Sequence, residues 1–149
     1  MSNQIIDKEV LVNASLNEVW NRWTTEDGIR TFFAEDCNVE LRVGGAYEMY
    51  FITDGTKGER GSEGCKVLSF LPYEMFSFTW NAPPSYPTVR NSGEYTYVVI
   101  NFEEIKKNKI KVRLRHLGWQ DGEEWDKVFT YFDRAWDKVL GWLTDSFEK

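Results

Sequence analysis

The chain has 149 residues, enough for one domain with a hydrophobic core and too few for two ordinary domains. Its 18 Lys and Arg residues against 24 Asp and Glu residues give a formal net charge of −6, which repels phosphate backbones and argues against nucleic acid as a partner. The amino-terminal residues lack the basic and apolar regions of a secretion signal, and no apolar run reaches membrane-spanning length, so we expect a single cytoplasmic domain over residues 1–149 without membrane insertion.

The first elements are a strand and two short helices. The stretch "IIDKEVLVN" mixes β-branched residues with charges and predicts a strand. In "SLNEVWNRW", Ser15 precedes Glu18 by three residues, the spacing of a capping box in which each side chain accepts a hydrogen bond from a backbone amide at the helix start. The stretch "TTEDGIRTFF" predicts a second short helix, capped by Thr24 or Thr25.

The middle of the chain changes to the period of two that is typical of strands. "NVELRVGGAYEMYF" predicts a hairpin that turns at Gly44-Gly45, because glycine tolerates the backbone angles of a tight turn. Its alternating apolar residues are Val39, Leu41, Val43, Tyr47, Met49 and Phe51. "EGCKVLSFLPYEMFSFTWN" predicts two more strands, of which the second places Phe76, Phe78 and Trp80 on one face.

A long connection and a last hairpin complete this antiparallel meander. "NAPPSYPTVRNSG" predicts a loop, the kind of segment that forms a plain surface or the rim of a site, where Tyr86 is the aromatic residue that could close an entrance. "EYTYVVINFEEIKKNKIKVRLRHL" predicts two strands that turn around residues 106–108.

The end of the chain predicts one long amphipathic helix. Asp121 and Glu124 have the spacing of a capping pair, and the apolar residues that follow recur at intervals of three and four. These are Trp125, Val128, Phe129, Phe132, Trp136, Val139, Leu140, Leu143 and Phe147. A helix of roughly 26 residues would be about 39 Å long, enough to cross a small sheet, which must cover the aromatic stripe.

This order of elements resembles the START-like (SRPBCC, helix-grip) superfamily, and within it the family related to the carboxy-terminal domain of the activator of heat-shock protein 90 ATPase. The resemblance rests on "VWNRWTTEDGIRTFF", "GGAYEMYF", "VLSFLPYEMFSFTW", "HLGW" and "AWDKVLGWLTDSFE", in this order over nearly the whole chain. It implies an α+β helix-grip fold, a curved antiparallel sheet of six to seven strands wrapped on the long helix. It also implies a cavity between sheet and helix, which in related proteins holds apolar or amphipathic molecules or has become a catalytic chamber.

Common catalytic and metal motifs are missing from the sequence. "GSEG" at residues 61–64 has the wrong spacing for a serine nucleophile, and the glycines of "GTKGERGSEG" lack the phosphate-loop pattern, so a flexible hairpin explains them better. One His and two distant Cys residues, Cys37 and Cys65, are a poor supply of metal ligands, and we expect reduced cysteines. We therefore expect no metal and no cofactor.

His116 is the single histidine, and strand alternation predicts that it points inward. In "KIKVRLRHL" it shares a face with Val112 and Leu114, while the basic residues lie on the other face. Three roles are open for it. It could tie the strand end to a backbone carbonyl as a structural residue, contact a ligand, or act as a base if a carboxylate orients it.

Three functional hypotheses follow from these observations. The first is a protein that binds a small apolar or amphipathic molecule in the cavity, the second is a stress-related or chaperone-associated interaction module, and the third is a cyclase- or hydrolase-like enzyme that uses His116. The expected ligand-binding residues are Tyr47, Met49, Phe51, Phe78, Trp80, His116, Trp119, Trp125, Phe129 and Phe132. The sequence is compatible with a monomer or a homodimer.

Overall fold

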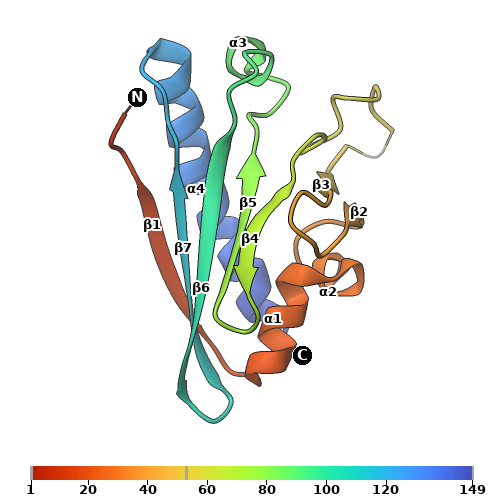
Figure 1. The fold of residues 1–149 in the computed structure, drawn as a ribbon, viewed down its shortest axis with the longest axis vertical. Helices are drawn as coiled ribbons and strands as arrows, with labels where there is room; N and C mark the ends of the chain where they lie inside the picture. Colours follow the sequence, from red (N-terminus) through yellow and green to blue (C-terminus); the bar gives the residue numbers. More distant parts are fainter. Residues whose placement is uncertain (1, 53, 149) are drawn as a thin grey trace.

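The fold of the described part of the chain follows the predicted order of elements. The structure, a computed structural model, describes residues 2–52 and 54–148. Its elements are β1 (Ile6–Val12), α1 (Leu16–Thr24), α2 (Glu26–Arg30), β2 (Asp36–Val39), β3 (Tyr47–Tyr50), β4 (Val67–Leu71), β5 (Met75–Trp80), α3 (Pro87–Arg90), β6 (Thr96–Lys106), β7 (Lys109–Leu117) and α4 (Glu123–Asp145). The α+β helix-grip architecture is confirmed (Figure 1), and α3 adds one helical turn to the connection that we expected to be a loop.

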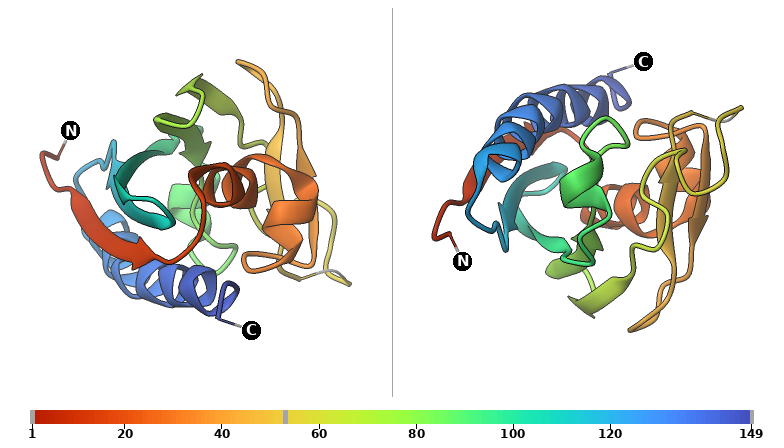
Figure 2. Two further views of the ribbon diagram at one scale, coloured as in Figure 1. Left: turned by 90° about the horizontal axis from the view of Figure 1, so that it is seen from below. Right: turned by 90° about the horizontal axis from the view of Figure 1, so that it is seen from above.

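The strands form two sheets. Five of them are antiparallel in the order β1-β7-β6-β5-β4, while β2 and β3 pair separately. Isolated bridges, Ala46 to Lys66 and Tyr50 to Gly61, join the small sheet to the segment before β4. In both views of Figure 2 the small sheet (orange) lies on the side of the molecule opposite β1 (red), with α4 (blue) running along the large sheet. The expected six or seven strands are therefore present, but they are divided between two sheets.

The hairpin around Gly44-Gly45 is shorter than its alternating sequence suggests. The β2 strand ends at Val39, and the amide of Glu40 donates to the carbonyl of Ala46, so the segment between them is a turn. Leu41 and Val43 do not face the core but are 41% and 68% exposed. The alternation in "NVELRV" therefore did not predict burial correctly, because the chain leaves the sheet after Val39, before Leu41 and Val43.

The helix starts show where capping signals were reliable. The Ser15 hydroxyl accepts from the Glu18 amide at 3.2 Å, the Glu18 carboxylate accepts from the Ser15 amide at 3.4 Å, and Thr25 caps α2 through the Gly28 amide. At α4 the prediction was wrong, because the N-cap is Gly122 with φ of 143° and the helix runs for 23 residues. A positive φ is open to glycine, so the chain turns into the helix one residue after Asp121.

Helix α4 packs its apolar stripe on the sheet and is fixed by charges on one flank. The buried residues of the stripe are Val128, Phe132, Trp136, Val139, Leu140 and Leu143. On the flank next to β1, Lys8 forms ion pairs with Asp133 at 3.2 Å and with Asp137 at 2.9 Å.

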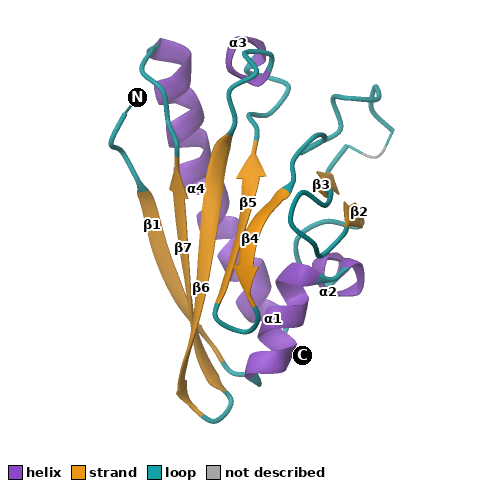
Figure 3. Ribbon diagram, viewed as in Figure 1, coloured by secondary structure: helices purple, strands orange, loops and turns teal. Residues whose placement is uncertain are grey.

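Long loops gather at one end of the molecule. Figure 3 shows the connection between β3 and β4 and the connection that holds α3 at the same end as the start of α4.

Within the described residues, no helix has the length and hydropathy to cross a membrane. Residues 2–52 and 54–148 also bring together no group of three or more His, Cys, Asp or Glu side chains that could hold a metal ion.

Candidate functional site

His116 points inward from the end of β7, as the strand alternation predicted, and both of its ring nitrogens are occupied. It is completely buried. The indole Nε1 of Trp136 donates to Nδ1 at 3.0 Å, and Nε2 lies 2.7 Å from the Thr96 hydroxyl. Because an indole N–H can only donate, Nδ1 must be the unprotonated nitrogen, so Nε2 donates to Thr96, which in turn donates to the carbonyl of Trp80 at 3.0 Å.

This network corrects the functional roles considered for His116. No ring nitrogen is left for a ligand, and the hydrogen-bond partners are a hydroxyl and an indole rather than an orienting carboxylate. Burial lowers the pKa of the imidazole from 6.5 to about 3, so the ring is neutral at physiological pH. His116 is a structural residue that joins β6, β7 and α4, and the hypothesis of an enzyme with His116 as base loses its catalytic group.

The buried neutral His116 predicts a pH-dependent stability. Between pH 6.5 and about 3 the unfolded chain binds a proton that the folded chain excludes, so acidification favours unfolding by up to about 1.4 kcal/mol per pH unit. From pH 6.5 to 4.5 we expect wild type to lose about 2 kcal/mol more than His116→Gln, measured by urea unfolding. Carboxylates with lowered pKa, such as Asp7, titrate in both proteins. Parallel stability curves for the two proteins would contradict the assignment.

Most of the sheet residues expected to line a cavity are packed in the core. Tyr47, Met49 and Phe78 are fully buried, the Tyr47 hydroxyl donates to the carbonyl of Trp23 at 2.7 Å, and the rings of Tyr47 and Phe78 are 4.4 Å apart. The ring of Tyr47 also packs on Phe76 at 5.1 Å, so these side chains lie in the core between β3, β5 and α1. None of the three lines the groove described below.

Three aromatic residues near the start of α4 also belong to the core. Trp119 is buried beside His116, with 4.4 Å between their ring centroids, and its indole donates to the carbonyl of His116 at 3.0 Å. Phe129 packs on Trp119 at 5.2 Å, and Trp125 is partly buried against the same core. None of the three contributes to the hollow described next.

A groove of about 860 Å³ runs along the flank of α4 that faces away from β1. We call it the α4 groove. Its floor consists of the buried residues Phe33, Trp80, Phe132, Trp136 and Val139. Above this floor stand three aromatic side chains that remain exposed to solvent: Phe51 by 49%, Tyr131 by 43% and Trp142 by 46%. Of the residues expected to bind a ligand, the structure brings Phe51, Trp80 and Phe132 together here.

Helical spacing explains how α4 lines the groove. Positions 127, 131, 134, 138 and 142 follow one another at three or four residues and therefore form a single stripe, next to the buried one. Ala135 lies in the same wall and leaves room because its side chain is small. Tyr86, from the connection after β5, also lines the groove and packs on Tyr131 with 6.0 Å between ring centroids.

Two smaller hollows adjoin the groove. One of about 480 Å³ lies towards α2 and shares Phe33, Phe51 and Trp142 with it. The other, of about 210 Å³, lies towards residues 81–84 and shares Phe51, Trp80, Tyr131 and Phe132. Phe51 lines all three, so its ring stands where the hollows meet.

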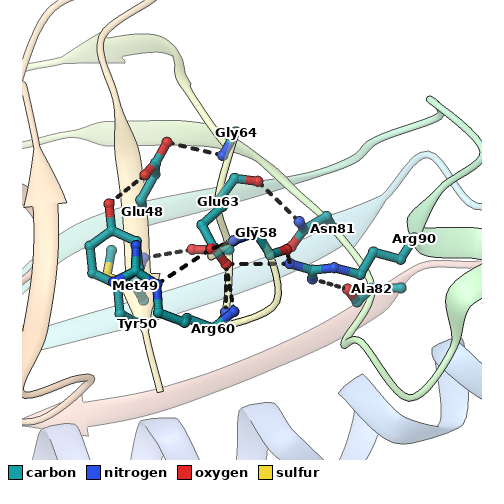
Figure 4. A network of polar contacts seen from close by, with 12 residues as sticks. Glu48, Met49, Tyr50, Gly58, Arg60, Glu63, Gly64, Asn81, Ala82 and Arg90 are labelled. Atoms are coloured by element: carbon teal, nitrogen blue, oxygen red, sulfur yellow. Dashed lines mark hydrogen bonds and ion pairs between the residues drawn. The ribbon is translucent and has the colours of Figure 1, made fainter. Parts of the chain in front are cut away.

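A polar network fixes the loop beside these hollows, as Figure 4 shows. The Glu63 carboxylate accepts from the amides of Arg60 at 2.8 Å and Gly61 at 2.9 Å, and also from the amide of Gly58. Arg90 donates to the carbonyls of Ala82 at 2.6 Å and Gly58 at 2.7 Å and pairs with Glu63 at 3.4 Å. Burial raises the pKa of Glu63, but the amides and Arg90 outweigh it, so the pKa lies below its ordinary value. The backbone amides of the glycine-rich stretch thus bind the Glu63 carboxylate.

Sequence reasoning missed Tyr131, Trp142 and the charged residues of the groove. The available signal was the presence of two large aromatic residues outside the apolar stripe of α4, where an amphipathic helix normally carries polar side chains.

Comparison with solved structures supports the fold. The Aha1 dimer from Colwellia psychrerythraea is 20% identical with a TM-score of 0.73, covering 97% of this chain and 96% of that one. Protein MLL2253 from Mesorhizobium loti is 14% identical with a TM-score of 0.76 and 97% of each chain covered. An HSP90 activator from Plasmodium falciparum is 16% identical with a TM-score of 0.69, covering 93% of this chain and 92% of the other.

The family follows from the sequence itself. No curated protein matched the chain. The model of one family, described as "Activator of Hsp90 ATPase homolog 1-like protein", matches residues 13–148, which includes every helix and all but the first strand. The chain therefore belongs to the family of activator of Hsp90 ATPase homolog 1-like proteins.

Proposed function

We propose that the protein binds a small apolar or amphipathic molecule in the α4 groove. The observation that carries this proposal is the arrangement of exposed Phe51, Tyr131 and Trp142 around a floor of buried rings. Exposed aromatic side chains of this size lose unfavourable contact with water when an apolar ligand covers them. The volume of about 860 Å³ falls within the range of ligand sites in proteins, roughly 300–1,000 Å³.

A neutral aromatic probe tests this function. N-phenyl-1-naphthylamine has 17 non-hydrogen atoms, and at roughly 0.4 kcal/mol for each atom we expect a Kd of about 10 μM. Binding would appear as a rise in probe fluorescence and as one site in isothermal titration calorimetry. If the fluorescence of the probe stayed unchanged at protein concentrations well above this expected Kd, the proposal would be contradicted.

Association with an Hsp90-type chaperone is the second candidate. It is supported by the description of the family and by the similar structure described as an HSP90 activator. We expect a chaperone partner to bind an outer surface of the domain. Lack of binding to the chaperone of the same organism in a pull-down, together with unchanged chaperone ATPase activity, would remove this candidate.

Two further expectations accompany the proposal. One similar protein is described as a dimer, which keeps a homodimer beside a monomer as a possible state of this chain. Location in the cytoplasm stays a prediction, with which the two free, buried cysteines Cys37 and Cys65 are compatible.

A further inference from the structure

Two cations stand together in the wall of the α4 groove without a partner. Arg134 and Lys138 are one helical turn apart, both are exposed, and both line the groove. Among the described residues, neither side chain forms a hydrogen bond, an ion pair or a contact with a ring face. Like charges at this spacing repel each other and destabilise a helix, so the pair is unfavourable while the groove is empty.

The nearby carboxylates of α4 form ion pairs with other lysines. Asp133 and Asp137 are their neighbours in sequence but lie on the opposite flank of α4, where both pair with Lys8. Glu123, near the other end of the groove, pairs with Lys127 at 3.7 Å. Three carboxylates of α4 are therefore paired with lysines, and none of them pairs with Arg134 or Lys138.

The charges divide the groove into two ends. Asp126 lines the end at the first turn of α4, beside the Glu123–Lys127 ion pair, and Arg134 lies eight residues after Asp126, about 12 Å along the helix axis. The rings of Trp80 and Phe132 form part of the floor between the two walls. A ligand with a negative group and an apolar body is thus attracted at one end of the groove, repelled at the other, and covered by rings along its length.

We propose that the ligand of the α4 groove is an anionic amphiphile, a small molecule whose carboxylate, sulfonate or phosphate group is held by Arg134 and Lys138 while its apolar body lies on the aromatic floor. This inference rests on the proposed function and adds the charge of the ligand to it. Guanidinium and ammonium groups form charge-assisted hydrogen bonds with such oxygens, which are stronger than those between neutral groups.

A pair of probes with the same ring system separates the charge from the apolar body. 8-Anilino-1-naphthalenesulfonate carries a negative group, and N-phenyl-1-naphthylamine is its neutral counterpart. We expect wild type to bind the sulfonate about 10-fold more tightly than the neutral probe, and the double variant R134Q/K138Q to lose this preference. Affinity for the neutral probe should change by less than about 2-fold. Raising the salt concentration from about 0.05 to 0.5 M should weaken only the binding of the sulfonate.

The matched control removes two positive charges elsewhere. Lys106, the last residue of β6, and Lys107, in the turn that follows, are exposed and do not line the groove, so K106Q/K107Q should keep the preference for the sulfonate. If both double variants lost the preference for the sulfonate equally, or if R134Q/K138Q kept it, the inference would be overturned. Binding of the neutral probe would still support the proposed function in that case. If neither probe bound to wild type, both the proposed function and this inference would be overturned. Binding to vesicles of anionic lipid without binding of the soluble sulfonate would assign the cations to a membrane surface instead and also overturn the inference.

Discussion

Trp136→Ala is expected to destabilise the protein by about 5 kcal/mol, measured by urea unfolding at pH 7.5. The Trp136 ring is buried between Phe33 at 5.8 Å, Trp80 at 5.7 Å and Phe132 at 6.3 Å, so truncation leaves a cavity whose cost is about 3–5 kcal/mol. Truncation also removes the donor to Nδ1 of His116, and an unsatisfied buried acceptor costs about 1–3 kcal/mol.

Two further variants separate these contributions. Trp136→Phe keeps a ring in the core but loses the donor, and we expect a loss of about 2–3 kcal/mol. Trp142→Ala removes the same side chain from the same helix at a position 46% exposed, and we expect a loss of less than about 1.5 kcal/mol. If the free energy of unfolding of Trp136→Ala lay within about 1 kcal/mol of the wild-type value, the contact between His116 and Trp136 would not be what holds α4 to the sheet.

Ala135→Trp is expected to weaken binding of the neutral probe at least about 30-fold. Ala135 is half-buried in the wall of the α4 groove, and neighbouring positions on the same face carry Tyr131 and Lys138. An indole at position 135 can reach over Trp80 and Phe132 and occupy the volume that the ligand would need. The measurement is calorimetric titration with N-phenyl-1-naphthylamine.

Ala135→Ser is the control for this substitution. Serine changes the size of the side chain little, so binding should stay within about 3-fold of wild type. If the melting temperature of Ala135→Trp lay within a few degrees of the wild-type value, the loss of binding would not be due to a loss of folding. Unchanged affinity in Ala135→Trp would place the bound probe outside the α4 groove.

Local signals predicted the fold well where a few neighbouring residues determine the geometry. Ser15 and Glu18 form the expected capping box because each needs only its neighbour three positions away. His116 is buried because strict alternation in β7 leaves one face for the core. The apolar stripe of α4, including Phe132 and Trp136, is likewise set by the period of the helix.

The candidate site was harder to predict because it depends on contacts between distant segments. Phe51 was expected among the ligand-binding residues on an inward strand face, but β3 ends one residue before it, and its ring is 49% exposed at the edge of the groove. Tyr47 and Phe78 were expected to line a cavity, but their rings are buried against each other and do not line the groove. Alternation gives the direction of a side chain and not the space that remains in front of it.

The indole resonances of the seven tryptophans test the location of the site most directly. In a ¹H–¹⁵N spectrum titrated with N-phenyl-1-naphthylamine, we expect the indole signals of Trp80 and Trp142 to shift, because both residues line the α4 groove. The signals of Trp23 and Trp119, which are buried in the core and line none of the three hollows described, should stay in place. Shifts of Trp23 and Trp119 with an unchanged Trp142 signal would show that the ligand enters the space between sheet and helix, and would contradict the α4 groove as the binding site.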